Sequence, residues 1–472
     1  MADTPPETAP ETTEAPATPS WLPPAALLAS MAEGWAERRP AVTGPVAAAP
    51  YHAARRRLLS ERFPGEWLVV QTGEPKVRAN DTDHRFRPGT DFAWLTGYHE
   101  ADAVLVLEPS PAGGHSETLF ARQVPERSSQ EHFTDTKNSE LWVGGRLSLD
   151  EVELALGIAT ADLADLEATL KRADGQAVRV VEGEGGARDA ELAKSLSQLR
   201  TVKDDHEIAC LEAAVAATVK GFEDVVRALP EATDLASERW VEGTFDRRAR
   251  TEGNDVGYET IAACGANACT LHWVRNDGPV RDGDLLLLDA GVEGPELYTA
   301  DVTRTLPVSG RFTAEQRDVY DAVWRAQRAG IEACRPGNAF LDPHRAAMRV
   351  IAEWLVERGI LTCSVEEALD PEQRLYQRYT LHGTSHMLGM DVHDCAAARD
   401  EHRTAALEPG MCLTVEPGCY LRPDDLTVPE AYRGIGVRIE DDVLITEDGC
   451  RVLSAALPTE ADEVEAWMRS LL

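Results

Sequence analysis

The chain has 472 residues, 43% of them hydrophobic, and carries a formal net charge of −34. This length predicts about two or three domains of an ordinary globular protein, and the acidic charge argues against nucleic acid and anionic membranes as partners. Nine cysteines, all after residue 209 and without a Cys-x-x-Cys pair, indicate free thiols in a reducing compartment. The acidic start and the lack of an apolar run of membrane length predict a cytoplasmic protein without a membrane segment.

Residues 1–45 are predicted to be an acidic, proline-rich tail and linker. Residues 1–20 are almost entirely Pro, Thr, Glu and Ala. Such a segment buries too little apolar surface to offset the entropy lost on ordering, so we expect disorder there. A helical pattern at 26–38 precedes the first domain.

Residues 46–199 are predicted to form a compact α/β domain, because short strands and helices follow one another along this part of the chain. Helical patterns lie at 51–63, 149–156, 161–170 and 189–199. Apolar runs bounded by turn residues predict strands at 67–70, 91–98, 103–107, 118–121 and 178–181.

Residues 200–472 are predicted to form a larger domain in which helix pairs alternate with antiparallel strands, an α+β arrangement. A long helix after Asp204 is expected to stop at Pro230. Asp234 is expected to open another helix, which ends near Gly253. Further helices are predicted at 313–333 and 342–359. Strand-like runs lie at 258–263, 270–274, 379–393, 411–420 and 434–445.

Two aspartates flank a predicted hairpin in this domain. Asp289 follows a run of four leucines, and Asp301 opens the next β-type run after the turn at Gly294 and Pro295. A turn centred on Pro295 would place the two aspartates opposite each other, with Cβ atoms about 4.5–5.5 Å apart. Like charges in such a pair destabilise a sheet, so a metal ion between them is the natural partner. Two unrelated surface aspartates are the alternative on these residues alone.

Three further stretches add candidate ligands: 382–394, 414–418 and 434–441. Glu416 and Glu440 each lie in an apolar strand context, where a carboxylate is costly unless it is paired or bound to a metal. Four carboxylates and one histidine would form an oxygen-rich site with one nitrogen ligand. Such a site suits divalent Mn, Co or Zn and disfavours copper.

The chain resembles the dinuclear "pita-bread" metallopeptidases, the group that contains aminopeptidase P, prolidase and methionine aminopeptidase. The resemblance rests on five residues that match the family's ligands in order and local context: Asp289, Asp301, His386, Glu416 and Glu440. The stretch 86–98, Phe-Arg-Pro-Gly-Thr-Asp-Phe-Ala-Trp-Leu-Thr-Gly-Tyr, is similar to the N-terminal domain of aminopeptidase P, which methionine aminopeptidase lacks. The resemblance therefore implies an N-terminal α/β domain of the creatinase and aminopeptidase P type at 46–199 and a catalytic pita-bread domain at 200–472.

The resemblance also implies two divalent metal ions, with Mn²⁺ as the expected metal. Asp289 would hold one ion, Asp301 and Glu440 would bridge both, and His386 and Glu416 would hold the other. A hydroxide between the ions would attack the carbonyl before the scissile bond, and Glu416 would shuttle its proton.

The remaining roles implied by the resemblance concern the substrate. His272 and His393 match histidines that contact the substrate carbonyl and stabilise the oxyanion, although a lone His272 would more often be structural. His382, Tyr420 and Arg438 match residues that line the pocket for proline or the departing chain, and Arg438 is expected to be a catalytic residue as well. Arg438 has an alternative role, in which it only neutralises the carboxylates.

The implied activity is that of an Xaa-Pro aminopeptidase, which releases the N-terminal residue from peptides with proline in the second position. A prolidase, acting on Xaa-Pro dipeptides, is the close alternative, and Ser385 before His386 favours aminopeptidase P because many prolidases carry glycine there. A binding protein on the same scaffold is disfavoured by the complete ligand set. The resemblance implies a homo-oligomer, dimer or tetramer. Ala93 replaces an aromatic residue of tetrameric relatives, so a neighbouring subunit's part in the site stays open.

Overall fold

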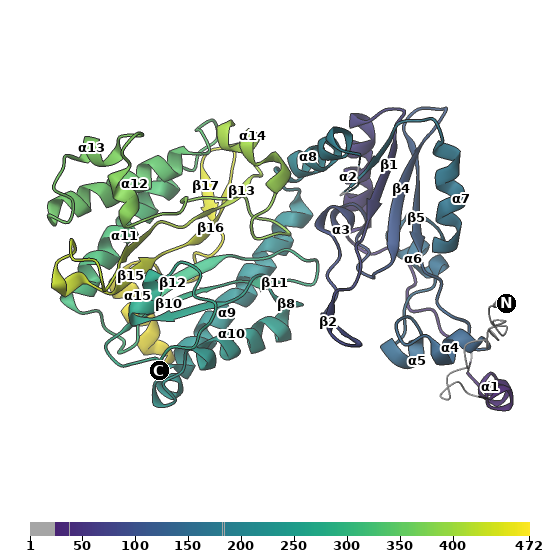
Figure 1. Cartoon of the computed structure of the whole chain (residues 1–472), viewed down its shortest axis with the longest axis horizontal. Coiled ribbons are helices and arrows are strands. Elements are labelled where there is room, and N and C mark those ends of the chain that lie inside the picture. The colour runs from purple at the N-terminus through teal and green to yellow at the C-terminus, as the bar shows by residue number, and fades with distance from the viewer. Residues whose placement is uncertain (1–23, 37, 182, 184) are drawn as a thin grey trace, which may run out of the picture.

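The computed structural model describes residues 24–36, 38–181, 183 and 185–472; residues 1–20, where disorder is predicted, lie outside these ranges. Figure 1 shows a smaller N-terminal body beside a larger C-terminal one, connected through α8 (Ala187–Arg200) and α9 (Asp205–Asp234). We propose the domain boundary at the end of α8, near residue 200. Within the described ranges, no helix is both long and apolar enough to cross a bilayer.

A mixed five-stranded sheet, in the order β6-β5-β4-β1-β7, forms the centre of the smaller body. Its strands are β1 (Trp67–Gln71), β4 (Ala103–Pro109), β5 (His115–Ala121), β6 (Ala159–Asp162) and β7 (Val178–Val180). Side chains alternate along β1: Leu68 faces the core that contains α2 and α3, and Trp67 faces the core that contains α7. The helices are α1 (Ala25–Met31), α2 (Ala49–Arg62), α3 (Thr90–Thr96), α4 (Gln130–Thr134), α5 (Glu140–Val143), α6 (Leu149–Leu156) and α7 (Leu166–Leu170). A short hairpin, β2 (Val77–Ala79) and β3 (Thr82–Asp83), projects beside the sheet.

Two assignments in this body are wrong. The predicted strand at 91–98 is the helix α3, whose residues 92–96 are all buried and therefore show no helical period in the sequence. Gly97 ends this helix at a φ of 68°, and a Cβ there would collide with the His52 ring. The predicted helix at 161–170 begins as the end of β6 and becomes helical only after a 3-10 turn.

The larger body consists of antiparallel strand groups packed against helix pairs. One sheet, in the order β12-β10-β9, contains β9 (Ile261–Cys264), β10 (Leu285–Ala290) and β12 (Val302–Pro307). A second contains β13 (Cys412–Val415), β16 (Asp441–Ile445) and β17 (Cys450–Val452). Two strand pairs join them: β8 (Asp255–Val256) with β11 (Val292–Glu293), and β14 (Gly418–Leu421) with β15 (Ile435–Arg438). The helices are α9, α10 (Glu238–Glu252), α11 (Ala314–Ala333), α12 (Asp342–Glu357), α13 (Val365–Leu369), α14 (Arg399–Thr404) and α15 (Ala461–Leu471).

Three details of this body differ from the sequence-based expectations. Helix α9 continues through Pro230 to Asp234, because Leu229 and Ala232 keep this turn packed in the core. Ser237, rather than Asp234, caps α10 through the backbone N–H of Trp240. The stretches 270–274 and 379–393 contain no strand. Part of the second stretch lies along β13 through backbone bonds of Thr384, His386 and Leu388, but this pairing amounts to a single bridge, between Met387 and Leu413.

The predicted hairpin register is also wrong. In the antiparallel pair of β10 and β12, Asp289 stands opposite Thr303 and not opposite Asp301. The turn centres one residue later than Pro295, because Gly294 pairs with Tyr298 and Leu297 adopts a positive φ of 67°. Each residue of β10 therefore stands opposite a residue of β12 two positions later than predicted. A shift of two residues leaves every side chain on the same face of the sheet. Asp289 and Asp301 therefore still point to the same side.

The contact between α9 and α10 yields the first testable prediction. Alanine normally stabilises a helix interior by up to about 1 kcal/mol over glycine, but a Cβ on Gly221 of α9 would lie 2.5 Å from the Phe245 ring of α10. We expect Gly221→Ala to lower the thermal midpoint of unfolding. A Cβ added to Gly243 of α10 would have nothing within 4 Å, so the control Gly243→Ala should leave the midpoint unchanged or raise it. Equal effects of the two changes would contradict this packing.

Candidate metal centre

The five predicted metal ligands come from five different segments of the larger body. Their places are Asp289 near the end of β10, Asp301 immediately before β12, His386 in the loop 379–393, Glu416 directly after β13 and Glu440 between β15 and β16. Asp289, Asp301 and Glu440 are buried, and His386 and Glu416 are partly buried. Both sheets therefore contribute carboxylates to one side of the domain interior.

Tyr258 joins the two aspartates. Its hydroxyl lies 2.7 Å from Oδ1 of Asp289 and 2.5 Å from Oδ1 of Asp301. A phenol has one proton and can donate to only one of these oxygens at a time. The space between the aspartates thus retains unbalanced negative charge. The sequence gives no sign of this residue beyond its place in a predicted strand.

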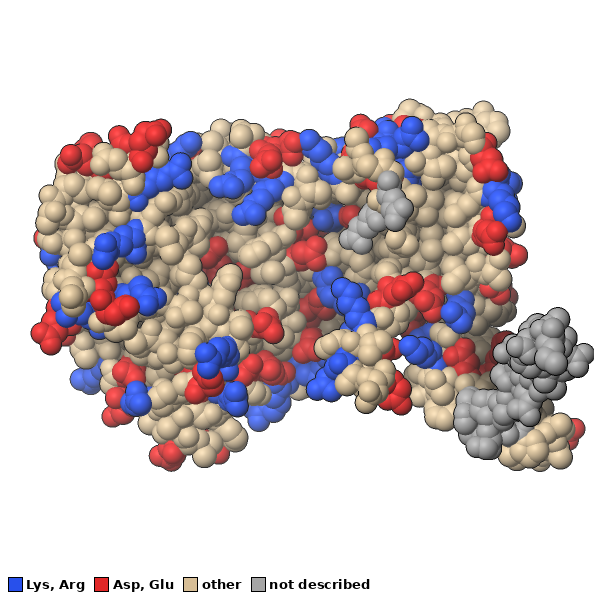
Figure 2. Space-filling model, viewed as in Figure 1, with Lys and Arg blue, Asp and Glu red and all other residues tan. Residues whose placement is uncertain are grey.

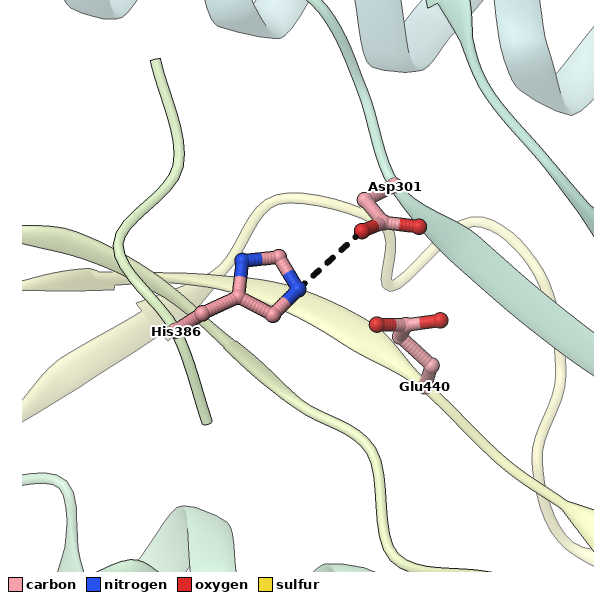
Figure 3. Close-up of side chains that lie close together, drawn as sticks. All are labelled: Asp301, His386 and Glu440. Atoms are coloured by element: carbon pink, nitrogen blue, oxygen red, sulfur yellow. Dashed lines mark ion pairs between the residues drawn. The ribbon is translucent and has the colours of Figure 1, made fainter. Parts of the chain in front are cut away.

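His386 is oriented by its backbone. Its Nδ1 lies 3.1 Å from the Met387 carbonyl oxygen, which holds a proton on Nδ1 and makes Nε2 the ring nitrogen that a metal would bind on displacing its proton. Nε2 faces Oδ2 of Asp301 at 3.3 Å and Oε1 of Glu416 at 3.6 Å. Figure 3 shows the imidazole pointing toward the carboxylates of Asp301 and Glu440. This tautomer is the one in which a histidine binds a metal through Nε2.

The electrostatics of the cluster favour a cation. Burial would lower the pKa of His386, but the carboxylates of Asp301 and Glu416 outweigh it and raise that pKa to about 9. Burial, followed by repulsion from Asp301, Glu416 and Asp289, raises the pKa of Glu440 well above its usual value. Ligand atoms of Asp301, His386 and Glu440 all lie within 4.8 Å of one another. The residues therefore fit divalent metal ions, since buried carboxylates need such a counter-charge.

The side chain of Arg438 lies inside this cluster, and its guanidinium donates hydrogen bonds to other protein residues. Its Nη2 donates to Oδ2 of Asp289 at 2.6 Å, and its Nη1 donates to the Tyr420 hydroxyl at 2.9 Å. Its Nε donates to Oγ1 of Thr303 at 3.2 Å. Arg438 therefore pairs with one ligand carboxylate, that of Asp289, and its contact with the substrate stays a prediction.

Four of the five predicted substrate residues lie around one cavity of about 490 Å³ next to the carboxylates, and the buried Tyr420 is not among its lining residues. His272, His382 and His393 line it, and Arg438 reaches its wall. His382 links the cavity wall to the buried Tyr420 behind it, since its Nε2 lies 2.7 Å from the Tyr420 hydroxyl and its Nδ1 lies 3.3 Å from Oε2 of Glu416 on the wall. The structure thus brings the substrate-facing side chains and the carboxylates to the same space.

Glu416 and His393 differ in protonation. Burial disfavours ionisation of Glu416, but His382 and His386 more than offset it and lower its pKa to about 2. Burial and the neighbouring His386, whose ring centroid lies 4.3 Å from that of His393, lower the pKa of His393. At neutral pH the site therefore offers an ionised carboxylate and a neutral imidazole beside the cavity.

The acidic residues near the motifs that were not proposed as ligands have other partners. Asp394 pairs with Lys203 at 3.2 Å and with Arg200 at 3.1 Å, and Asp441 pairs with Arg304 at 2.7 Å. Cys412 and Cys419 are buried in apolar cores. On the visible face of the molecule, acidic and basic side chains are interspersed, so the net charge of the chain does not concentrate in one patch there (Figure 2).

Comparisons with known proteins agree with this geometry. The model of metallopeptidase family M24 matches residues 209–447, and the model of the aminopeptidase P N-terminal domain matches residues 52–181. "Xaa-Pro aminopeptidase 1" of Streptomyces coelicolor is 54% identical over 458 residues, which cover 94% of this chain and 92% of that protein. "Xaa-Pro aminopeptidase" of Escherichia coli is 33% identical, with coverage of 89% and 97%.

A solved structure of E. coli aminopeptidase P with the inhibitor Pro-Leu superimposes with a TM-score of 0.80 at 31% identity, and covers 91% of this chain and 99% of that one. These matches confirm the predicted α+β fold with its N-terminal aminopeptidase P domain and its catalytic pita-bread domain. The chain therefore belongs to metallopeptidase family M24, in its Xaa-Pro aminopeptidase (aminopeptidase P) branch, and it is an enzyme of that type.

Proposed function

We propose that the chain removes the N-terminal residue from peptides whose second residue is proline, with Mn²⁺ as its native metal. The observation that carries this proposal is the cluster of carboxylates and one histidine beside a cavity large enough for a short peptide. Oxygen ligands with a single imidazole suit Mn²⁺ better than softer metals. The names of the relatives supply the substrate class.

The chain's own residues would divide the work as follows. Asp289, Asp301 and Glu440 would hold one of two divalent ions, and Asp301, Glu440, His386 and Glu416 the other. When bound, the ions supply a hydroxide nucleophile at neutral pH and polarise the scissile carbonyl. Glu416 is ionised, so it can accept the nucleophile's proton and pass it to the leaving proline nitrogen.

The substrate would contact the opposite wall of the cavity. His393 is neutral and keeps one ring N–H as a donor toward the carbonyl oxygen. His272 would donate from the other side, so that the developing oxyanion meets two imidazoles. His382 and Tyr420, which hydrogen-bond each other, would border the proline ring. Arg438 would hold Asp289 and Tyr420 in place for the substrate.

The proposal also includes the compartment and the oligomeric state of the enzyme. The nine cysteines are all free, which is typical of a cytoplasmic protein. The resemblance to aminopeptidase P supports a homo-oligomer, dimer or tetramer. Ala93 is buried in α3. A site completed by a neighbouring subunit stays an open alternative.

A prolidase activity has one observation in its favour. The exposed Arg399 lines the cavity, and a guanidinium there could pair with the carboxylate of an Xaa-Pro dipeptide. Ser385 before His386 and the complete N-terminal domain favour the aminopeptidase. Substrate length decides between the two activities.

The metal ligands provide the second testable prediction. Asp301→Ala removes the proposed bridge, so it should abolish turnover and lower the bound metal while the circular dichroism spectrum stays that of the parent protein. Chelation should inactivate the parent enzyme, and Mn²⁺ should restore it. Asp189 is an equally buried aspartate, which accepts backbone hydrogen bonds in the smaller body, and Asp189→Asn should retain metal and turnover. Full activity of the metal-stripped protein would contradict the mechanism.

Substrate length provides the third prediction. An aminopeptidase must leave the side beyond proline open for the chain, whereas a dipeptidase gains from pairing the terminal carboxylate. We expect a higher kcat/KM on Arg-Pro-Pro than on any Xaa-Pro dipeptide, and at most a small residual rate when alanine replaces proline in the second position. A clear preference for dipeptides would assign the chain to prolidase chemistry with the same metals.

A further inference from the structure

His272 stands on a loop that a single buried glutamate holds. Residues 264–278, here called the His272 loop, leave the sheet at the end of β9 and form a 3-10 turn (Gly265–Cys269) before they reach the cavity. Glu238, the first residue of α10, lies beneath this loop and is 0% exposed. A buried carboxylate needs partners for its lone pairs, and here all of them come from the loop.

The carboxylate accepts four hydrogen bonds, two on each oxygen. Oε1 accepts from the backbone N–H of Cys264 at 2.8 Å and from the side-chain amide of Asn267 at 2.8 Å. Oε2 accepts from the Trp273 indole N–H at 2.8 Å and from the Gly278 backbone N–H at 2.6 Å. These four donors include both ends of the loop and the residue directly after His272. One side chain therefore fixes the loop at its start, middle and end.

The end of the His272 loop, at Gly278, packs closely against Glu238. The Glu238 backbone N–H donates to the Gly278 carbonyl at 3.1 Å, so the two residues bind each other in both directions. A Cβ on Gly278 would lie 2.2 Å from Nδ2 of Asn267 and 2.7 Å from Oε2 of Glu238. Only glycine lets the backbone approach the carboxylate so closely.

Asn276 anchors the same loop to the sheet. It is 0% exposed and adopts a positive φ of 44°. Its Oδ1 accepts from the Ala262 N–H at 2.9 Å, and its Nδ2 donates to the Thr260 carbonyl at 2.8 Å. Two buried polar side chains, Glu238 and Asn276, thus hold a loop whose His272 side chain lies on the cavity wall.

We propose that Glu238 is a positioning residue for the reaction, which acts by holding His272 over the cavity. The inference rests on the proposed function, in which His272 donates to the substrate carbonyl. A donor must sit within hydrogen-bond reach of the developing oxyanion, and a misplacement of about 1 Å can cost about a hundredfold in rate. Glu238 itself touches neither the substrate nor the metal ligands, so its effect must pass through the loop.

The test uses Glu238→Gln in the full-length, metal-loaded enzyme. Glutamine keeps the shape but points an NH₂ group at two donors, which breaks the fourfold contact. We expect kcat on Arg-Pro-Pro to fall about tenfold or more, with KM changed less than twofold and with metal content unchanged. The decisive measurement repeats the substitution in a His272→Ala background. There Glu238→Gln should cause no further loss of kcat, because the imidazole that Glu238 positions is absent.

Glu207 provides a matched control. It is 2% exposed near the start of α9 and accepts from the Trp94 indole N–H at 3.0 Å and from the Tyr298 hydroxyl at 2.9 Å. Glu207→Gln and Glu238→Gln should both lower the thermal midpoint of unfolding, but Glu207→Gln should leave kcat unchanged. This control separates a loss of stability from a loss of positioning.

The outcomes separate the two proposals. If His272→Ala lowers kcat and Glu238→Gln lowers it further by the same factor in both backgrounds, the positioning role is wrong while the proposed function stands. If His272→Ala leaves kcat unchanged, the role of His272 and this inference both fail. If Glu238→Gln does not fold, Trp273→Phe takes its place, because it removes a single donor from the contact. Its effect on kcat is then measured in the parent enzyme and in the His272→Ala background. If Trp273→Phe lowered kcat by the same factor in both backgrounds, the inference would again be overturned.

Discussion

The buried carboxylates of the larger body carry more negative charge than their protein neighbours balance. Asp289, Asp301 and Glu440 are almost fully buried, and Arg438 pairs directly with only Asp289. Burial raises the pKa of Glu440 and lowers that of His386, but the neighbouring carboxylates raise the pKa of both residues. Metal ions are the counter-charge that such a group of oxygens requires.

The rest of the domain holds these carboxylates together against their repulsion. Thr303 donates its hydroxyl to Oε2 of Glu440 at 2.7 Å, and the Glu440 N–H bonds the Thr303 carbonyl, so the two sheets meet at this ligand. Arg304, which is 1% exposed, uses all five of its N–H groups on protein acceptors, including the Glu440 carbonyl and the Asp441 carboxylate. The N–H of Asp301 donates to Oδ2 of Asp442 at 3.1 Å. The ligand positions are thus set by hydrogen bonds with Thr303, Arg304 and Asp442.

The smaller body reaches the same region from outside. Arg87 donates to Oε2 of Glu293 at 2.5 Å and to the Met390 carbonyl at 2.7 Å, and Thr90 donates to Asp391 at 2.6 Å. These bonds hold the segment that precedes His393. The two bodies also share one apolar core, to which Leu297 and Met390 of the larger body contribute. Chain segments far apart in sequence therefore converge on the cavity wall.

The sequence was sufficient to predict the fold class and the segments that carry the carboxylates, because their motifs and apolar contexts are local. The cap residues Asp204 and Thr313 predicted the starts of α9 and α11 correctly. The hairpin register failed by two residues because a positive φ at Leu297 cannot be foreseen from side-chain types. The apolar residues of 379–393 predict a strand, whereas the structure forms a single bridge there, between Met387 and Leu413. Tyr258 and Glu238 were missed because their partners lie far along the chain and only the folded structure brings them together.

Anomalous X-ray diffraction at the manganese edge, on crystals grown with Mn²⁺, tests the central claim most directly. The account predicts two peaks per chain, about 3.5–4 Å apart, with Asp301 and Glu440 in contact with both and with Asp289 on one side and His386 and Glu416 on the other. A single peak, or peaks away from these five side chains, would contradict it.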